Sequence, residues 1–166
     1  MDYRAELVRA DGDASDVWLG RVGHAAVPTR DGKVLIVGGA DVIPGSAPGT
    51  IPKFRDVYAD LQIFDPETGY FTDLSYDEDA QRPRPEGGDQ LSEPRAFHSV
   101  TPLGEDRFVV AGGYTQLADQ SRPVRPLELI DLNADPGERV VPLTSASGTP
   151  LSLNSPRGFH EAVFLE

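Results

Sequence analysis

A single short motif, Arg-x-x-His, occurs three times along this 166-residue chain, and a glycine pair follows the first two copies at the same distance. The repeated residues are Arg21 and His24, Arg95 and His98, Arg157 and His160, with the glycine pairs Gly38-Gly39 and Gly112-Gly113. Self-similarity of this kind is typical of repeat architectures, in which each copy is one supersecondary unit that buries its apolar face against the next.

The segments between and after these residues recur in the same order. Each of the first two copies has an apolar stretch, a polar turn and a Val-rich run ending at the glycines, and then two further short strands. The expected strands are 25–28, 34–37, 61–64 and 70–74 in the first copy, and 99–103, 108–111, 127–130 and 138–143 in the second. In the third strands, period-two alternation predicts that Gln62 and Glu128 point away from the core. Four short strands per copy, joined by turn residues, predict four-stranded antiparallel units.

The motif set resembles the kelch repeat: an Arg-x-x-His strand, an apolar strand ending in Gly-Gly, the turn Asp65-Pro66-Glu67-Thr68-Gly69 and then Phe71. The resemblance implies an all-β fold, a β-propeller fragment of four-stranded antiparallel kelch-like blades. The expected divisions are the end of a preceding blade with its strands 3 and 4 (1–20), two kelch-like blades (21–94 and 95–156) and the first strand of a following blade (157–166). Since propellers close with about 4–8 blades, we expect the remaining blades to come from a parent chain or from self-association.

Composition limits the classes of partner. The formal net charge is −12, which argues against binding to a phosphate backbone, because such binding needs clustered Lys and Arg. No apolar run approaches the roughly 20 residues that span a bilayer, so we expect no membrane insertion. The chain has no cysteine, which excludes disulfides and thiolate metal sites but leaves the compartment open.

The longest connections are expected to carry any binding function. Second-to-third and fourth-to-first connections emerge on the same face of antiparallel blades, and long loops on one face of a rigid scaffold are commonly the binding side. The candidate contact residues in these loops are Lys53, Phe54, Arg55, Tyr58, Arg82, Arg84, Arg122 and Arg125. The connection 75–94 is acidic and proline-rich. Many kelch propellers are interaction platforms, so the resemblance implies a non-enzymatic module that binds a protein or a carbohydrate ligand.

The histidines and glycines are interpreted as structural. Each histidine holds the same place in its copy, which favours equivalent hydrogen bonds over a shared metal centre, and the preceding arginine is expected to join strands or blades. The glycine pairs lack the helix and Lys of a phosphate-binding loop. We therefore assign no catalytic residue, no metal ligand and no cofactor. The alternative is part of a kelch-like propeller enzyme, galactose-oxidase-like or sugar-modifying; the oxidase needs a cysteine-linked tyrosine that this chain does not supply.

Overall fold

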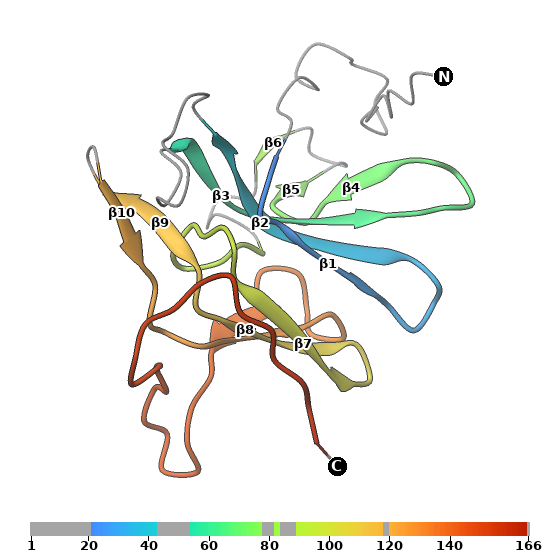
Figure 1. Ribbon diagram of the computed structural model, residues 1–166. Helices are drawn as coiled ribbons and strands as arrows, with labels where there is room; N and C mark the ends of the chain where they lie inside the picture. The colour runs from blue at the N-terminus through green and yellow to red at the C-terminus, as the bar shows by residue number, and fades with distance from the viewer. Residues whose placement is uncertain (1–20, 43–53, 78–81, 84–88, 118–119, 166) are drawn as a thin grey trace.

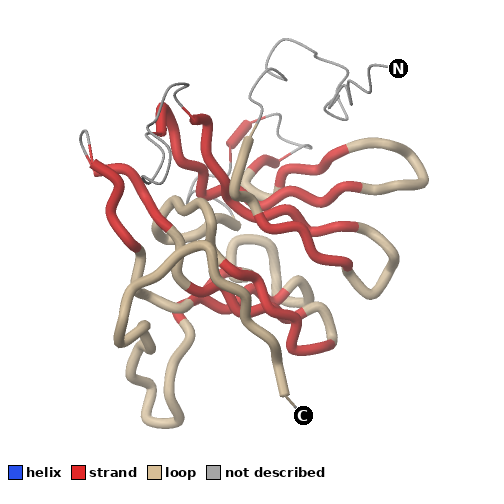
Figure 2. The backbone as a smooth tube through the Cα atoms, viewed as in Figure 1, coloured by secondary structure: helices blue, strands red, loops and turns tan. Residues whose placement is uncertain are grey.

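The structure, a computed structural model, describes residues 21–42, 54–77, 82–83, 89–117 and 120–165. These residues form strands and turns, and no helix occurs among them (Figure 2). Most of the strands belong to two four-stranded antiparallel sheets that lie one against the other (Figure 1). The expectation of an all-β chain with four-stranded antiparallel units is confirmed.

The first sheet contains β1 (Ala25–Pro28), β2 (Val34–Val42), β3 (Phe54–Phe64) and β4 (Phe71–Asp73), side by side in that order. The second sheet contains β7 (Ser99–Gly104), β8 (Arg107–Ala111), β11 (Glu128–Asp131) and β12 (Val140–Pro142), again neighbours in chain order. Both sheets are therefore meanders, and we call the segments 21–94 and 95–156 the first and second unit. Within both units, strand pairing is antiparallel throughout.

Two smaller ribbons interrupt the meanders. β9 (Tyr114–Leu117) pairs with β10 (Gln120–Pro123) between the second and third strands of the second unit. β5 (Tyr76–Asp77) pairs with β6 (Arg82–Pro83) between the two units. In the first unit, β2 and β3 themselves continue past the glycine pair, with irregular register at Gly38 and again near Val42. The expected long second-to-third loops are thus partly built as projecting antiparallel ribbons.

The main core lies between the two sheets, and it follows from the period-two alternation of the strands. The buried members are Val27, Leu35, Val37 and Leu61 from the first sheet, Phe108, Val110 and Ile130 from the second, and Leu91 from the connection between the units. Burying each such side chain stabilises the fold by roughly 1.5–3 kcal/mol. Packing one sheet face on the next unit, rather than propensity alone, therefore holds the two meanders together.

Two local expectations differ from the structure. The segment expected as the first strand of a following blade, 157–166, forms no strand in its described part, residues 157–165; no neighbouring strand completes a hydrogen-bond ladder with these residues in the described chain. Glu128 was expected to point away from the core, and this is wrong: its side chain is only 2% exposed. The guanidinium of Arg95 provides the partner that makes this burial possible.

Candidate functional site

The repeated arginines tie each unit to its own second and third strands. Arg21 donates from Nη1 to the carbonyl of Gly38 at 3.1 Å and binds Asp60 through both terminal nitrogens at 3.0 and 2.9 Å. In the second unit, Arg95 donates to the equivalent carbonyl of Gly112 and forms an ion pair with Glu128. Arg21 and Arg95 therefore make equivalent side-chain contacts within their own units.

A recurrent corner forms where each Arg-x-x-His segment crosses the glycine pair. The residue before the histidine is left-handed in all three copies, with φ of 64° at Gly23, 58° at Phe97 and 56° at Phe159. Phe97 N–H donates to the carbonyl of Gly23 at 2.6 Å, and Phe159 N–H donates to that of Phe97 at 2.9 Å. The C-terminal segment therefore repeats the backbone of the two units although it has no sheet around it.

The two glycines of each pair have different neighbours. A methyl group on Gly39 would lie 3.0 Å from Cβ of His24, in its own unit, whereas one on Gly38 would lie 2.5 Å from the carbonyl oxygen of Arg95, in the next unit. Gly113 and Gly112 repeat this pattern with His98 and Arg157. All four glycines have positive φ, so they give close backbone approach between units. This supports the structural interpretation of the glycine pairs.

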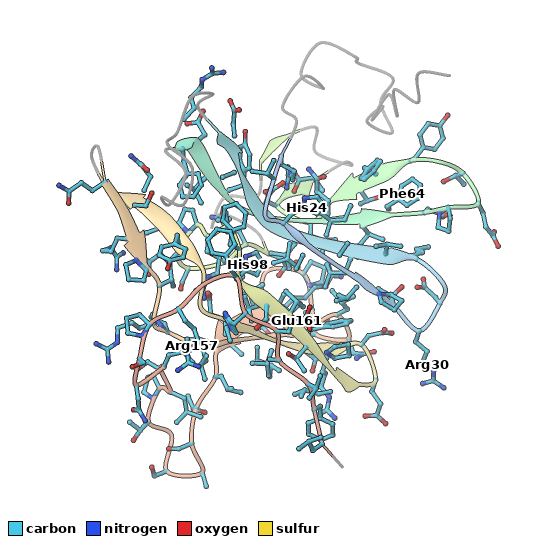
Figure 3. The ribbon with its side chains drawn as sticks, viewed as in Figure 1. His24, Arg30, Phe64, His98, Arg157 and Glu161 are labelled. Atoms are coloured by element: carbon cyan, nitrogen blue, oxygen red, sulfur yellow. The ribbon has the colours of Figure 1, made fainter. Side chains whose placement is uncertain are left out.

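The histidines are placed equivalently but are not equally buried (Figure 3). His24 is exposed, while His98 is 7% exposed and neither ring nitrogen has a hydrogen bond of ordinary geometry. Burial, followed by the nearby positive charge of Arg95, lowers the pKa of His98 from 6.5 to about 3, and the Arg95 backbone acts weakly in the opposite direction. His98 is therefore neutral at ordinary pH, as a packed structural residue would be.

His160 shows the hydrogen bond that His98 lacks. Its Nε2 lies 3.1 Å from the hydroxyl of Ser99 in the preceding unit. The residue equivalent to Ser99 in the first unit is Ala25, because each directly follows the motif histidine. Burial also lowers the pKa of His160. His98 therefore lacks this hydrogen bond because the first unit has the methyl group of Ala25 where the second unit has the hydroxyl of Ser99.

The projecting ribbons carry several of the residues that the sequence analysis named as contacts. Arg55 on β3 is exposed and forms an ion pair with Asp41 of β2 at 3.0 Å. Arg122 on β10 is partly exposed and pairs with Glu93. Arg125 donates to the carbonyls of Leu153 and Asn154, both at 3.2 Å. β3 and β9 contact each other, so the two ribbons lie side by side (Figure 1).

Other expected contact residues are placed differently. Phe54 is 2% exposed and packs with Ala40, Ala96 and Phe97. The ring of Tyr58 lies under the Arg21 guanidinium, with its centroid 4.8 Å from Cζ, and its buried hydroxyl has no hydrogen-bond partner among the described residues. Burial, and then the neighbouring Asp41, raises the pKa of Tyr58. Arg82 begins β6, while Lys53 and Arg84 lie outside the described residues.

The acidic connection 75–94 contributes to packing in the part that the structure describes. Asp89 is 1% exposed, and its carboxylate accepts N–H groups of Gly137 and Arg139 at 3.0 Å as well as the Arg139 guanidinium at 3.2 Å. Asp89 and Glu93 lie in the segment before the second unit, and they therefore bind that segment to the second unit. Sequence reasoning missed this role, because nothing local distinguishes Asp89 from the other carboxylates of the connection.

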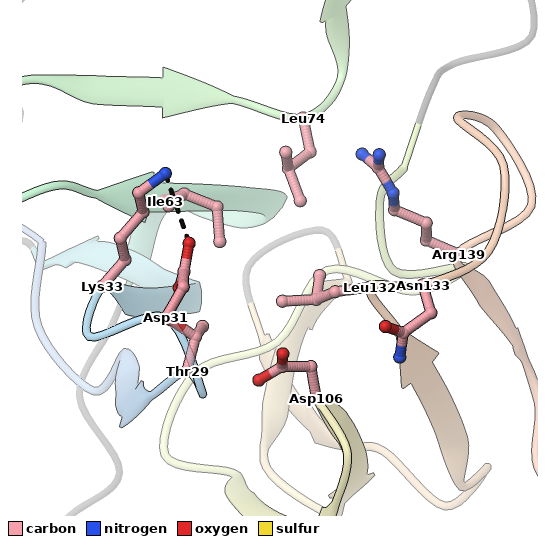
Figure 4. A pocket seen from close by; sticks show the side chains of 9 residues that line it. All are labelled: Thr29, Asp31, Lys33, Ile63, Leu74, Asp106, Leu132, Asn133 and Arg139. Carbon is pink, nitrogen blue, oxygen red and sulfur yellow. Dashed lines mark hydrogen bonds and ion pairs between the residues drawn. The ribbon is translucent and has the colours of Figure 1, made fainter.

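A second feature that the sequence did not reveal is a cleft of about 240 Å³ between the two sheets (Figure 4). It is lined by Thr29, Asp31, Lys33, Ile63, Leu74, Asp106, Leu132, Asn133 and Arg139. These residues come from five separate turns and strand ends. They meet only because the two sheets pack together, so no sequence motif could have identified them.

The part of the chain that the structure describes contains no group of three or more His, Asp or Glu side chains placed to hold a metal ion. Within the same residues, no helix is long and apolar enough to cross a membrane. Comparison with protein-family models and with curated proteins gives no match to this chain.

Proposed function

We propose that this chain is an arc of kelch-like propeller blades that acts as a non-enzymatic protein-binding module, with the contact surface on the projecting ribbons β2–β3 and β9–β10. The kelch resemblance supplies the starting point. The repeated four-stranded meanders, with equivalent arginine, histidine and glycine contacts, support it.

The observation that carries the binding proposal is the position of the extra chain. In both units the connection between second and third strands extends into an antiparallel ribbon, and these ribbons are neighbours on one side of the molecule. Their described surfaces expose Arg55, Asp56, Gln120 and Arg122. Exposed charges of both signs on rigid projections suit a complementary protein surface, where they set orientation and association rate.

The test is an affinity capture with the whole chain, followed by binding measurements on each partner recovered. Charge reversal at Arg55→Glu, and separately at Arg122→Glu, should weaken binding of a genuine partner by about tenfold or more. The control is Glu67→Arg, in the exposed β3–β4 turn at the other end of the first sheet. Equal binding by all four proteins, with unchanged thermal stability, would remove the ribbons as the contact surface.

A further inference from the structure

The cleft between the sheets has charged and polar side chains on two sides. On the first-unit side lie the turn residues Thr29, Asp31 and Lys33, and on the second-unit side lie Asn133 and Arg139 (Figure 4). Asp106 belongs to the second unit but reaches the first wall. Its carboxylate accepts the backbone N–H of Arg30 at 2.6 Å, which brings it beside the turn that carries Asp31.

Asp106 is held at this wall by a strained turn. Glu105 and Asp106 are consecutive left-handed residues, with φ of 52° and 53°, a conformation that two-residue hairpins use but that Asn and Gly adopt more readily. The second oxygen of Asp106 has no hydrogen-bond partner among the described residues. Lys33 lies 3.3 Å from Asp31 and partly neutralises it. Asp106 is therefore the main acceptor for a positive group at this wall.

The side chain of Arg139, on the opposite wall, is held in place by residues that do not line the cleft. Its Nε donates to the carbonyl of Ala134 at 3.3 Å and its Nη1 to the buried carboxylate of Asp89 at 3.2 Å. Within the described chain no residue accepts a hydrogen bond from Nη2. A guanidinium that is already oriented by a buried carboxylate is well placed to take a further acceptor, since little side-chain freedom is lost on binding.

Apolar side chains lie between the two walls. Ile63, Leu74 and Leu132 all line the cleft, and Leu132 projects between the walls in Figure 4. An aliphatic chain laid on these three side chains would remove apolar surface from water on both partners, which favours binding. The cleft thus presents an acceptor at Asp106, apolar side chains and a donor at Arg139.

We propose that this cleft binds a small linear aliphatic zwitterion, with its ammonium group at Asp106, its methylene chain on Ile63, Leu74 and Leu132, and its carboxylate at Arg139. A ligand with only one charged end leaves one wall without its counter-group. The proposal does not depend on the ribbons or on the propeller interpretation.

The probe is 6-aminohexanoate, titrated into the whole chain up to tens of millimolar while backbone amide signals are followed by NMR. We expect saturable shifts at Gly32, Asp106 and Asn133. Hexylamine lacks the carboxylate and hexanoate lacks the ammonium, so each should bind about tenfold more weakly or worse. The absence of saturable shifts, shifts that map to other surfaces, or equal binding of all three compounds would overturn the proposal.

Asp106→Asn separates the ammonium contact from the integrity of the fold. Asn tolerates the left-handed conformation and still accepts the Arg30 N–H through its side-chain oxygen. The variant should weaken 6-aminohexanoate and hexylamine about tenfold and leave hexanoate unchanged. The matched control is Glu105→Gln, the neighbouring turn carboxylate, which does not line the cleft. If both variants bind 6-aminohexanoate equally, the assignment of Asp106 is wrong.

Discussion

The same arginine–carboxylate pair is built in both units but in different surroundings. In the first unit, the side chains of Arg21 and Asp60 are 17% and 20% exposed, whereas those of Arg95 and Glu128 are 0% and 2% exposed. Arg95 is covered from both sides, because its N–H donates to Tyr58 and its carbonyl accepts from Gly39, both in the preceding unit. The comparison indicates that the burial of the arginine–carboxylate pair depends on packing against the preceding unit, and not on the Arg-x-x-His motif alone.

The carboxylates also come from different positions in the third strand. Gln62 lies opposite Ile36, and Glu128 lies opposite the equivalent residue Val110. In the first unit, Gln62 instead donates to Asp60 at 3.0 Å, and Asp60 supplies the charge from two residues earlier. The ion pair is therefore reproduced although the acidic residue has moved along the strand.

The largest expected difference between the units is in their ion pairs. Glu128→Gln should destabilise the fold by about 3–5 kcal/mol, because it leaves Arg95 buried without its counter-charge. Asp60→Asn should cost only about 1 kcal/mol, because solvent reaches that pair. Urea unfolding of both variants against the wild type measures the two values. Similar losses would show that burial does not distinguish the pairs.

The second difference is in pH dependence. Since the pKa of His98 is lowered from 6.5 to about 3, the unfolded chain binds a proton there between these values and the folded chain does not. Stability should therefore fall as pH decreases from 6.5, by up to about 1.4 kcal/mol per pH unit, and the contribution should be fully present above 6.5. Comparing the pH profile of His98→Gln with that of the wild type tests this, and the variant should have the flatter profile.

The third difference concerns the glycines that face the next unit. Gly38→Ala places a methyl group 2.5 Å from the Arg95 carbonyl at positive φ, and should cost about 2–3 kcal/mol. Gly112→Ala would make a comparable contact with Arg157. Because Arg157 lies in a segment that belongs to no described sheet, this segment can shift, and the expected loss of stability is about 1–2 kcal/mol. Thermal unfolding ranks the two. Gly32→Ala, which meets no atom, is the control for φ alone.

The smallest expected effect is a gain. Ala25→Ser places a hydroxyl where the second unit has Ser99, and so offers a partner to Nε2 of His98. It should stabilise the fold by about 1 kcal/mol, and Ser99→Ala should lose a similar amount through His160. Chemical denaturation measures both. A destabilised Ala25→Ser variant would mean that the two histidines are not oriented alike.

The strands were more predictable than their contacts. Alternation and turn residues predicted β1 over its whole length and the cores of the other meander strands, because a strand's period is a local property. The burial of Glu128 and Asp89 and the meeting of Asp31 with Asp106 depend on how two sheets pack, so they could not be predicted locally. The ribbons were expected as loops, and for β10 the reason is that its polar sequence, Gln120-Ser121-Arg122-Pro123, lacks an apolar face.

The contacts of the glycine pairs have a consequence for how such a chain can change in length. Each pair contacts the histidine of its own copy through its second glycine and the arginine carbonyl of the adjoining copy through its first. If residues 21–94 were duplicated in tandem, a second copy of Arg21 would follow Pro94. The carbonyl of that arginine could then contact Gly39, as the carbonyl of Arg95 does now. Residues 21–94 as a whole can therefore be duplicated or lost without changing the contacts between adjoining copies.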